Sequence, residues 1–225
     1  APAHISDRQY RFDYLDGRVR AENRLSAFAY PGDRIPADMT RLLAVAQSAR
    51  TVPAPLLAMD TAPAAVLGAL YDPHTRGLAA AGPLIICNIG NFHTIAFRLG
   101  SQGIEGVFEH HTGLIDHTKL ETLLLKLAAG SLTHAEVFGD HGHGALVYNP
   151  APMDLAGRLV VTGPRRAMLS ASSLRPHFAV PFGDMMVAGC VGLLSAAADH
   201  FPELAQPLRN ALNRQESSGR APWEG

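Results

Sequence analysis

Cysteine, net charge and long apolar runs are all scarce in this sequence. The two cysteines, Cys87 and Cys190, each lie within an apolar stretch, which favours buried free thiols in a reducing cytoplasm. Without a Cys-x-x-Cys pattern, neither a thiolate zinc site nor an iron–sulfur cluster is supported. The formal net charge of −1 gives no reason to expect nucleic acid or a membrane surface as a partner. No apolar run reaches the ~18 residues of a membrane span, and residues 1–14 lack a signal-peptide pattern.

The composition is that of an ordinary globular protein, and we expect a cytoplasmic one. Its 225 residues, 47% hydrophobic and 17% charged, suffice for one or two domains with a substantial core. Residues 9–15 alternate charged and aromatic side chains and predict a strand. Residues 39–50 have helical spacing. Residues 56–70 are interpreted as a short strand, a tight turn and a buried helix, with Thr61 as N-cap and Pro63 in the first turn.

From residue 84 onward the pattern predicts a mixed sheet. The expected order is strand, strand, strand, helix, strand, helix, strand, helix, over residues 84–88, 93–99, 103–109, 116–129, 159–162, a helix from about Arg166, 177–180 and 183–198. Three meandering strands followed by alternating helices and strands make an α/β fold with helices on the faces of the sheet. The tail from Gln215 is polar and is predicted to be mobile.

Three stretches of sequence carry a family likeness. They are DTAPAAVLGAL at 60–70, LIICNIGNFHTIAFRL at 84–99 and LVVTGPRRAML at 159–169. They resemble the linking helix, the second phosphate loop and the adenosine loop of the actin, sugar kinase and seventy-kilodalton heat-shock ATPase superfamily. The resemblance implies a ribonuclease-H-like second lobe of the actin-like ATPase fold.

The same resemblance implies a domain organisation. Residues 1–80 would be a remnant of the first lobe plus the linking helix, residues 81–215 the ribonuclease-H-like lobe, and residues 216–225 a mobile tail. Nothing before Asp60 matches the first phosphate loop of the superfamily. We therefore expect this chain to be the C-terminal portion of a longer protein, with the missing N-terminal lobe as its partner.

A narrower likeness covers nearly the whole chain. The strings that carry it are SDRQYRF, MDTAPAAVLGAL, NIGNFHTIAF, FEHHTG, GHGA and GDMMVAGC, in that order. Together they resemble a domain family of unknown function that is labelled as a pyruvate formate-lyase activating enzyme. Such an activator is a radical enzyme and needs three clustered cysteines for its iron–sulfur cluster. Because two isolated cysteines cannot supply that cluster, we do not expect radical chemistry.

The superfamily resemblance implies ATP with magnesium, bound between lobes. Phosphates would contact Asn88, Gly90, Asn91, His93 and Thr94, and the nucleoside would contact Thr162 and Gly163. Gly90 lets the backbone turn and bring N–H groups close to an anion. Asn88 stands where the superfamily has an aspartate, which weakens metal binding because an amide brings no charge. A plain hairpin with an Asn/Gly turn is the alternative.

Two histidine-containing segments are candidates for acid–base chemistry or metal binding. Alternation along a strand places Glu109 and His111 on one face and His110 on the other. The loop that contains Asp140, His141 and His143 offers further ligands suited to zinc or manganese, and we expect His111, His141 and His143 as the metal set. The alternatives are hydrogen-bonded packing histidines and a solvent loop.

Further polar residues have capping or surface alternatives. Asp60 would either cap the helix that comes after it or point into the cleft. Asp184, another candidate cleft residue, begins a helix and is electrostatically favourable there. Arg8, Tyr10 and Arg11 could bind an anion, although a solvated strand face is the favoured interpretation.

The leading functional hypothesis is an ATP-dependent phosphotransferase or ATPase of unknown acceptor. Asp60, Glu109 and His111 are the expected catalytic residues, with Asp60 or Glu109 orienting the acceptor. One alternative is a metal-dependent hydrolase that uses the His, Asp and Glu cluster. Another is a non-catalytic binding module. The expected ligand is a small molecule or nucleotide, and the sequence leaves the oligomeric state open.

Overall fold

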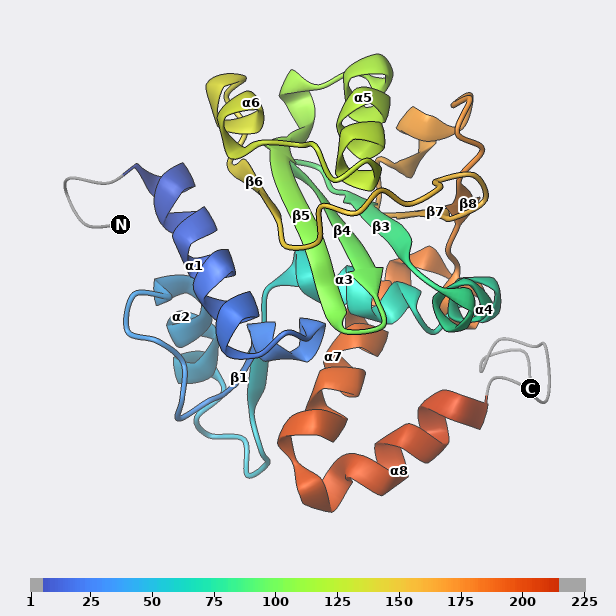
Figure 1. The fold of residues 1–225 in the computed structure, drawn as a ribbon. Helices are drawn as coiled ribbons and strands as arrows, with labels where there is room; N and C mark the ends of the chain where they lie inside the picture. The colour runs from blue at the N-terminus through green and yellow to red at the C-terminus, as the bar shows by residue number, and fades with distance from the viewer. Residues whose placement is uncertain (1–5, 215–225) are drawn as a thin grey trace.

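The computed structural model describes residues 6–214 and contains a six-stranded mixed sheet (Figure 1). The strands lie in the order β6-β5-β4-β3-β7-β8. Their bounds are β3 Leu84–Ile89, β4 His93–Gly100, β5 Gly103–His111, β6 Gly144–Val147, β7 Leu159–Thr162 and β8 His177–Phe178. β3, β4 and β5 form an antiparallel meander, β7 and β8 run parallel to β3, and β6 pairs antiparallel with β5. The predicted meander within a mixed α/β sheet is confirmed.

Helices cover both faces of this sheet (Figure 1). One face packs against α1 (Asp7–Ala21), α3 (Thr61–Ala69) and α7 (Ala188–His200), and we call it the α1 face. The other packs against α5 (His117–Ala128) and α6 (His134–Gly139). β3 shows how the sequence serves both cores, because Leu84 and Ile86 point to the α1 face while Ile85 and Cys87 point to the other. None of the helices within residues 6–214 is long and apolar enough to cross a membrane.

The strand predicted over residues 9–15 is wrong, because these residues lie within helix α1. Ser6 is the N-cap and accepts a hydrogen bond from the backbone N–H of Gln9. The buried residues Phe12, Leu15 and Val19 are spaced three and four apart, so they share one side of the helix. The charged residues between them gave the alternation that suggested a strand. Through α1 and α3, the segment 1–80 contributes to the same core as the central sheet.

The predicted strand, turn and buried helix near residue 60 are confirmed. β2 (Leu57–Met59) pairs antiparallel with β1 (Ala29–Pro31) in a separate two-stranded sheet and leads into α3. The N-cap of α3 is Asp60 and not Thr61, because the Asp60 carboxylate accepts the backbone N–H of Ala62. The helix predicted over 39–50 is α2 (Thr40–Ser48).

The second half of the chain needs two corrections. The helix expected from Arg166 is a single 3-10 turn, Arg166–Leu169. The helix expected over 183–198 begins at Ala188, after two 3-10 turns, because the positive φ angles of Phe182 and Gly183, 55° and 79°, interrupt the helical path.

Several elements were not predicted. They include β1, β6, α4 (Pro73–Ala81), α6 and α8 (Pro202–Asn213). Helix α8 begins with a proline and contains another. The predicted mobile tail, 216–225, lies outside the described residues.

Two glycines bring α3 and α7 into backbone contact. A Cβ atom added at Gly68 would lie 1.8 Å from the carbonyl oxygen of Ala188. A Cβ added at Gly192 would lie 1.9 Å from the carbonyl oxygen of Ala64. Each glycine therefore faces the backbone of the other helix, and no larger residue fits unless the helices separate.

We expect Gly192→Ala to lower the free energy of unfolding by about 3 kcal/mol, because the new methyl group must displace α3 from the core. Gly189→Ala is the matched control on the same helix, because nothing lies within 4 Å of a Cβ at that position. The control should be neutral or slightly stabilising, since alanine is the better helix former. Urea unfolding of both variants measures the difference, and equal stability of the two would contradict the described helix contact.

Candidate functional site

Polar residues gather at one edge of the central sheet. β3 and β7 end at this edge, β4 begins there, and β5 ends there because it runs antiparallel to β4. Side-chain alternation puts five of these residues on the α1 face, in line with the buried apolar residues of that core. They are Asn88, His93, Glu109, His111 and Thr162. The strand pairing therefore brings together residues that are up to 74 positions apart, from Asn88 to Thr162.

Three of the histidines form a compact cluster, which we call the histidine triad: His93, His111 and His143. His93 and His111 are direct partners in the β4–β5 pairing. Their ring centroids are 4.9 Å apart, and the ring of His143 lies 4.9 Å from His93 and 4.8 Å from His111. One ring nitrogen of each residue can be chosen so that all three lie within 4.8 Å of one another. This spacing is suited to three ligands around one metal ion.

His143 is the most unusual member of the triad. Both of its ring nitrogens are buried, yet neither has a hydrogen-bond partner within the part of the chain that the structure describes. Burial lowers the pKa of His143 to about 4 against the opposing effect of Glu109. Its backbone N–H donates to the Glu109 carbonyl at 2.9 Å, so the main chain fixes its position beside β5. Burying a polar side chain without a partner is unfavourable, and such a group requires an explanation.

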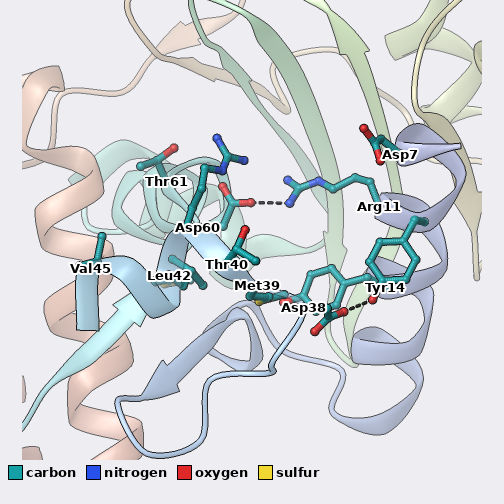
Figure 2. Close-up of a pocket in the computed structure, with 13 residues that line it drawn as sticks. Asp7, Arg11, Tyr14, Asp38, Met39, Thr40, Leu42, Val45, Asp60 and Thr61 are labelled. Carbon is teal, nitrogen blue, oxygen red and sulfur yellow. Dashed lines mark hydrogen bonds and ion pairs between the residues drawn. The ribbon is translucent and has the colours of Figure 1, made fainter. Parts of the chain in front are cut away.

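Arg11 joins two acids that were expected from the sequence to be catalytic. Its Nε and Nη2 atoms donate to the Glu109 carboxylate at 2.9 and 3.3 Å, and its Nη1 donates to Asp60. Figure 2 shows Arg11 reaching from α1 towards Asp60. Glu109 Oε2 in turn lies 3.9 Å from His143 Nδ1. A continuous polar chain therefore runs from Asp60 through Arg11 and Glu109 to the histidine triad.

Burial makes this chain depend on its charges being paired. The side chain of Glu109 is 3% exposed and that of Arg11 is 22% exposed. Burial acts to lower the pKa of Arg11, but Glu109 and Asp60 outweigh it and hold that pKa above its usual value. Burial likewise acts to raise the pKa of Asp60, and Arg11 outweighs it, so that the pKa lies below the usual value. Both groups are therefore charged at neutral pH.

Arg8 precedes Arg11 by one helical turn and holds the loop that carries His143. Its Nη1 donates to the carbonyl oxygens of Phe138 and Gly142, at 3.1 and 2.7 Å, and its guanidinium lies 4.3 Å from the centre of the Phe138 ring. The interpretation of Arg8 and Arg11 as a solvated strand face is therefore wrong. Arg8 and Arg11 are three positions apart, a spacing that puts two side chains on the same side of a helix. A helical interpretation of this segment would therefore have predicted that they lie side by side.

The loop 140–143 divides between the two faces of the sheet. His110 lies on the far face, where its Nε2 is 3.2 Å from Asp140 Oδ2, and Lys119 also pairs with Asp140 at 2.8 Å. The hydrogen bond from Lys119 outweighs desolvation and lowers the pKa of Asp140. His141 is exposed, with a φ of 64°, and stays outside the triad. His93 takes the place in the metal set that was expected for His141.

The hairpin predicted to hold phosphate is tightly organised. The Gly90 N–H donates to the His93 carbonyl at 2.9 Å and closes the turn, while Asn91 is exposed. Thr94 points to the far face, where its hydroxyl lies 2.9 Å from that of Thr112. Asn88 and His93 are thus the members of the predicted phosphate set whose side chains share the α1 face.

Thr162 and Gly163 lie at the end of β7, beside the end of β3. Gly163 has a φ of 98°, and a Cβ there would lie 2.5 Å from the Ile89 carbonyl oxygen and 2.7 Å from Asn88 Oδ1. The backbone at this glycine therefore closely approaches β3. The Thr162 hydroxyl is buried and has no hydrogen-bond partner among residues 6–214.

The remaining candidates lie in other settings. Asp184 caps a 3-10 turn by accepting the Met186 N–H at 2.8 Å.

The two cysteines differ in burial. Cys87 is a buried free thiol whose pKa is raised by burial, as expected. Cys190 is exposed, so the expectation that it is buried is wrong.

We expect Arg11→Ala to lower the free energy of unfolding by about 3 kcal/mol, because it leaves Glu109 buried without its partner. Arg20→Ala, which removes the mostly exposed pair with Asp16, is the control and should cost much less than the Arg11 change, because exposed ion pairs contribute little. Urea unfolding of each variant gives the comparison. In Arg11→Met combined with Glu109→Gln, which removes both charges, part of the loss should be recovered. An equal loss in the Arg11 and Arg20 variants would rule out a buried ion-pair chain.

Comparison with known proteins supports the narrower resemblance found in the sequence. A family model described as "Putative pyruvate format-lyase activating enzyme (DUF1786)" matches residues 1–168 of the chain. No curated protein and no solved structure matches the chain. Because the family model spans well over half of the 225 residues, the chain belongs to this family.

Proposed function

We propose that the protein is a metal-dependent hydrolase whose metal is held by the histidine triad. The observation that carries this proposal is His143, whose two buried ring nitrogens have no partner among the described residues and which faces His93 and His111. A divalent transition metal of the zinc class would supply the missing partner, since imidazole nitrogen is among its preferred ligands.

The composition of the triad favours a catalytic over a structural metal. Structural zinc sites use four protein ligands, whereas catalytic sites often use three and leave a position for water or substrate. A bound metal of this class would supply Lewis acidity and a readily ionised water. The three histidines are the protein's part of that arrangement.

Glu109 would act on the triad as an orienting group. Its carboxylate is fixed by Arg11 and lies near His143 Nδ1, at 3.9 Å. A carboxylate next to a ligating histidine fixes the ring orientation and raises its basicity. Asp60 would in turn orient Arg11, which gives both acids a role different from phosphoryl transfer. Asp140 and His141 take no part in this proposal.

The second candidate is the nucleotide-binding phosphotransferase suggested by the superfamily resemblance. The strand order supports a ribonuclease-H-like lobe, because β3, β4 and β5 form the meander and β7 and β8 join in parallel on the other side of β3. Asn88 and Thr162 are neighbours on the α1 face, and the Thr162 hydroxyl has unused bonding capacity. ATP with magnesium should then raise the melting temperature, and the rise should be lost in Thr162→Val. No rise in the wild-type chain would remove this candidate.

The activity named in the family description is not part of the proposal. Cys87 lies in the middle of β3 and Cys190 on the exposed side of α7. Two thiols on separate elements do not provide the three clustered cysteines that a radical activator requires.

Metal analysis tests the leading proposal. Protein dialysed against zinc and then against metal-free buffer should retain about one zinc ion per chain by elemental analysis. His143→Ala and His111→Ala should weaken zinc binding by at least about 100-fold, because each removes a ligand. His141→Ala is the control and should retain the metal, since His141 is exposed and outside the triad.

Two further measurements complete the test. Without metal, His143→Ala should be as stable as the wild type or more so, because the change removes a buried polar group that lacks a partner. The zinc-loaded wild type should hydrolyse p-nitrophenyl esters faster than the metal-free protein, and the triad variants should lose that increment. Equal zinc retention in the wild type and in His143→Ala would contradict the proposed centre.

A further inference from the structure

A second potential site lies on the other side of Arg11 from the histidine triad. It is a pocket of about 400 Å³ between α1 and α2, and Arg11 and Asp60 form part of its wall (Figure 2). None of the three triad histidines lines it. Cavities of this size commonly accommodate small organic molecules, in contact with apolar walls and a few polar groups. A ligand in this pocket would therefore occupy a site separate from the proposed metal centre, with Arg11 and Asp60 between the two.

The pocket has an apolar wall. Met39, Leu42, Val45 and Met59 line it, together with the ring of Tyr14. Val45, on the helix that borders the pocket, is 54% exposed and lines the cavity. Covering such a side chain with an apolar ligand group removes apolar surface from water. The shape and lining therefore favour a ligand with an apolar body.

The acids that line the pocket already have donors or favourable surroundings. Asp60 accepts from Arg11 and from the backbone N–H of Ala62. Asp38 accepts from the hydroxyl of Tyr10. Asp7 lies in the first turn of α1, where the helix N-terminus favours a carboxylate. These carboxylates are therefore not the groups with unused bonding capacity.

Arg41 is the lining residue that has donors to spare. It is exposed, and within residues 6–214 it makes no hydrogen bond or close ion pair, although its charge acts on the Asp60 carboxylate. Burial opposes the ionisation of Asp60, but Arg11, the backbone N–H of Ala62 and, as the smallest contribution, the charge of Arg41 together outweigh it and lower the pKa of Asp60. Arg41 and Asp60 line the same pocket. A guanidinium offers five N–H donors in a planar fork that matches a carboxylate.

We propose that this pocket binds a small amphipathic carboxylate, with the carboxylate on Arg41 and the apolar body against Met39, Leu42 and Val45. Thr40 and Thr61 also line the pocket and are the sequence neighbours of Arg41 and Asp60. Their hydroxyls would be further hydrogen-bond donors to the ligand carboxylate. The ligand class follows from the exposed guanidinium of Arg41, which makes no hydrogen bond or close ion pair within residues 6–214, and from the apolar wall of the same cavity.

Calorimetric titration with octanoate tests the proposal. Octanoate should bind, whereas acetate, which lacks the apolar chain, and octylamine, which carries the opposite charge, should bind at least about tenfold more weakly. Arg41→Gln should weaken octanoate binding by roughly tenfold, since it removes the charge but keeps a polar side chain. Arg50→Gln is the matched control, because Arg50 lies just beyond the C-terminal end of α2 and outside the pocket, and this variant should bind as the wild type does.

A second variant tests the apolar wall. Val45→Glu places a negative charge where the ligand body would lie, and it should weaken octanoate binding by at least about tenfold. Its fold should be retained because the side chain is already exposed. The proposal is overturned if octanoate fails to bind, if Arg41→Gln binds it as tightly as Arg50→Gln does, or if octylamine binds more tightly than octanoate.

Discussion

The ion pairs of helix α1 hold the candidate site together. Arg11 neutralises Glu109, which is almost fully buried, and links it to Asp60 at the start of α3. Arg8, one turn earlier, holds the backbone that leads to His143. A buried carboxylate without a cation would be strongly unfavourable, so β5 can carry Glu109 only where α1 supplies its partner. The position of helix α1 thus affects both the geometry of the triad and the wall of the neighbouring pocket.

The sequence predicted the central strands and α5 because their patterns are strong. β3 and β7 are β-branched apolar runs, and α5 has leucines at helical spacing, so local sequence and tertiary burial agree. α1 was missed because its buried residues are separated by charged ones whose partners lie in distant parts of the chain. Those partners, Glu109 and the loop carbonyl groups near Phe138, cannot be read from local periodicity.

Local patterns also explain which residues of the candidate site the sequence predicted. Glu109 and His111 were placed on one face by simple alternation, and the structure agrees. His143 was expected to be a ligand, but the choice between His93 and His141 depends on strand register and on a loop with a positive φ angle. His93 was interpreted as a phosphate contact because of the superfamily resemblance. The pairing that brings it next to His111 depends on the register of the whole hairpin, which a local pattern does not give. The sequence thus indicated that histidines and acids form the site, but it did not show which three histidines lie together.

The glycine contact between α3 and α7 has a consequence for Asp60. The carbonyl oxygens of Ala64 and Ala188 lie where a Cβ of the opposing glycine would be, so the two helices are fitted together at the backbone level. Because the two backbones are closely packed, neither helix can shift without displacing the other. The position of Asp60, the N-cap of α3, therefore depends on the packing of α7 as well as on α3 itself. Small residues late in the chain therefore help to fix the position of the carboxylate that pairs with Arg11.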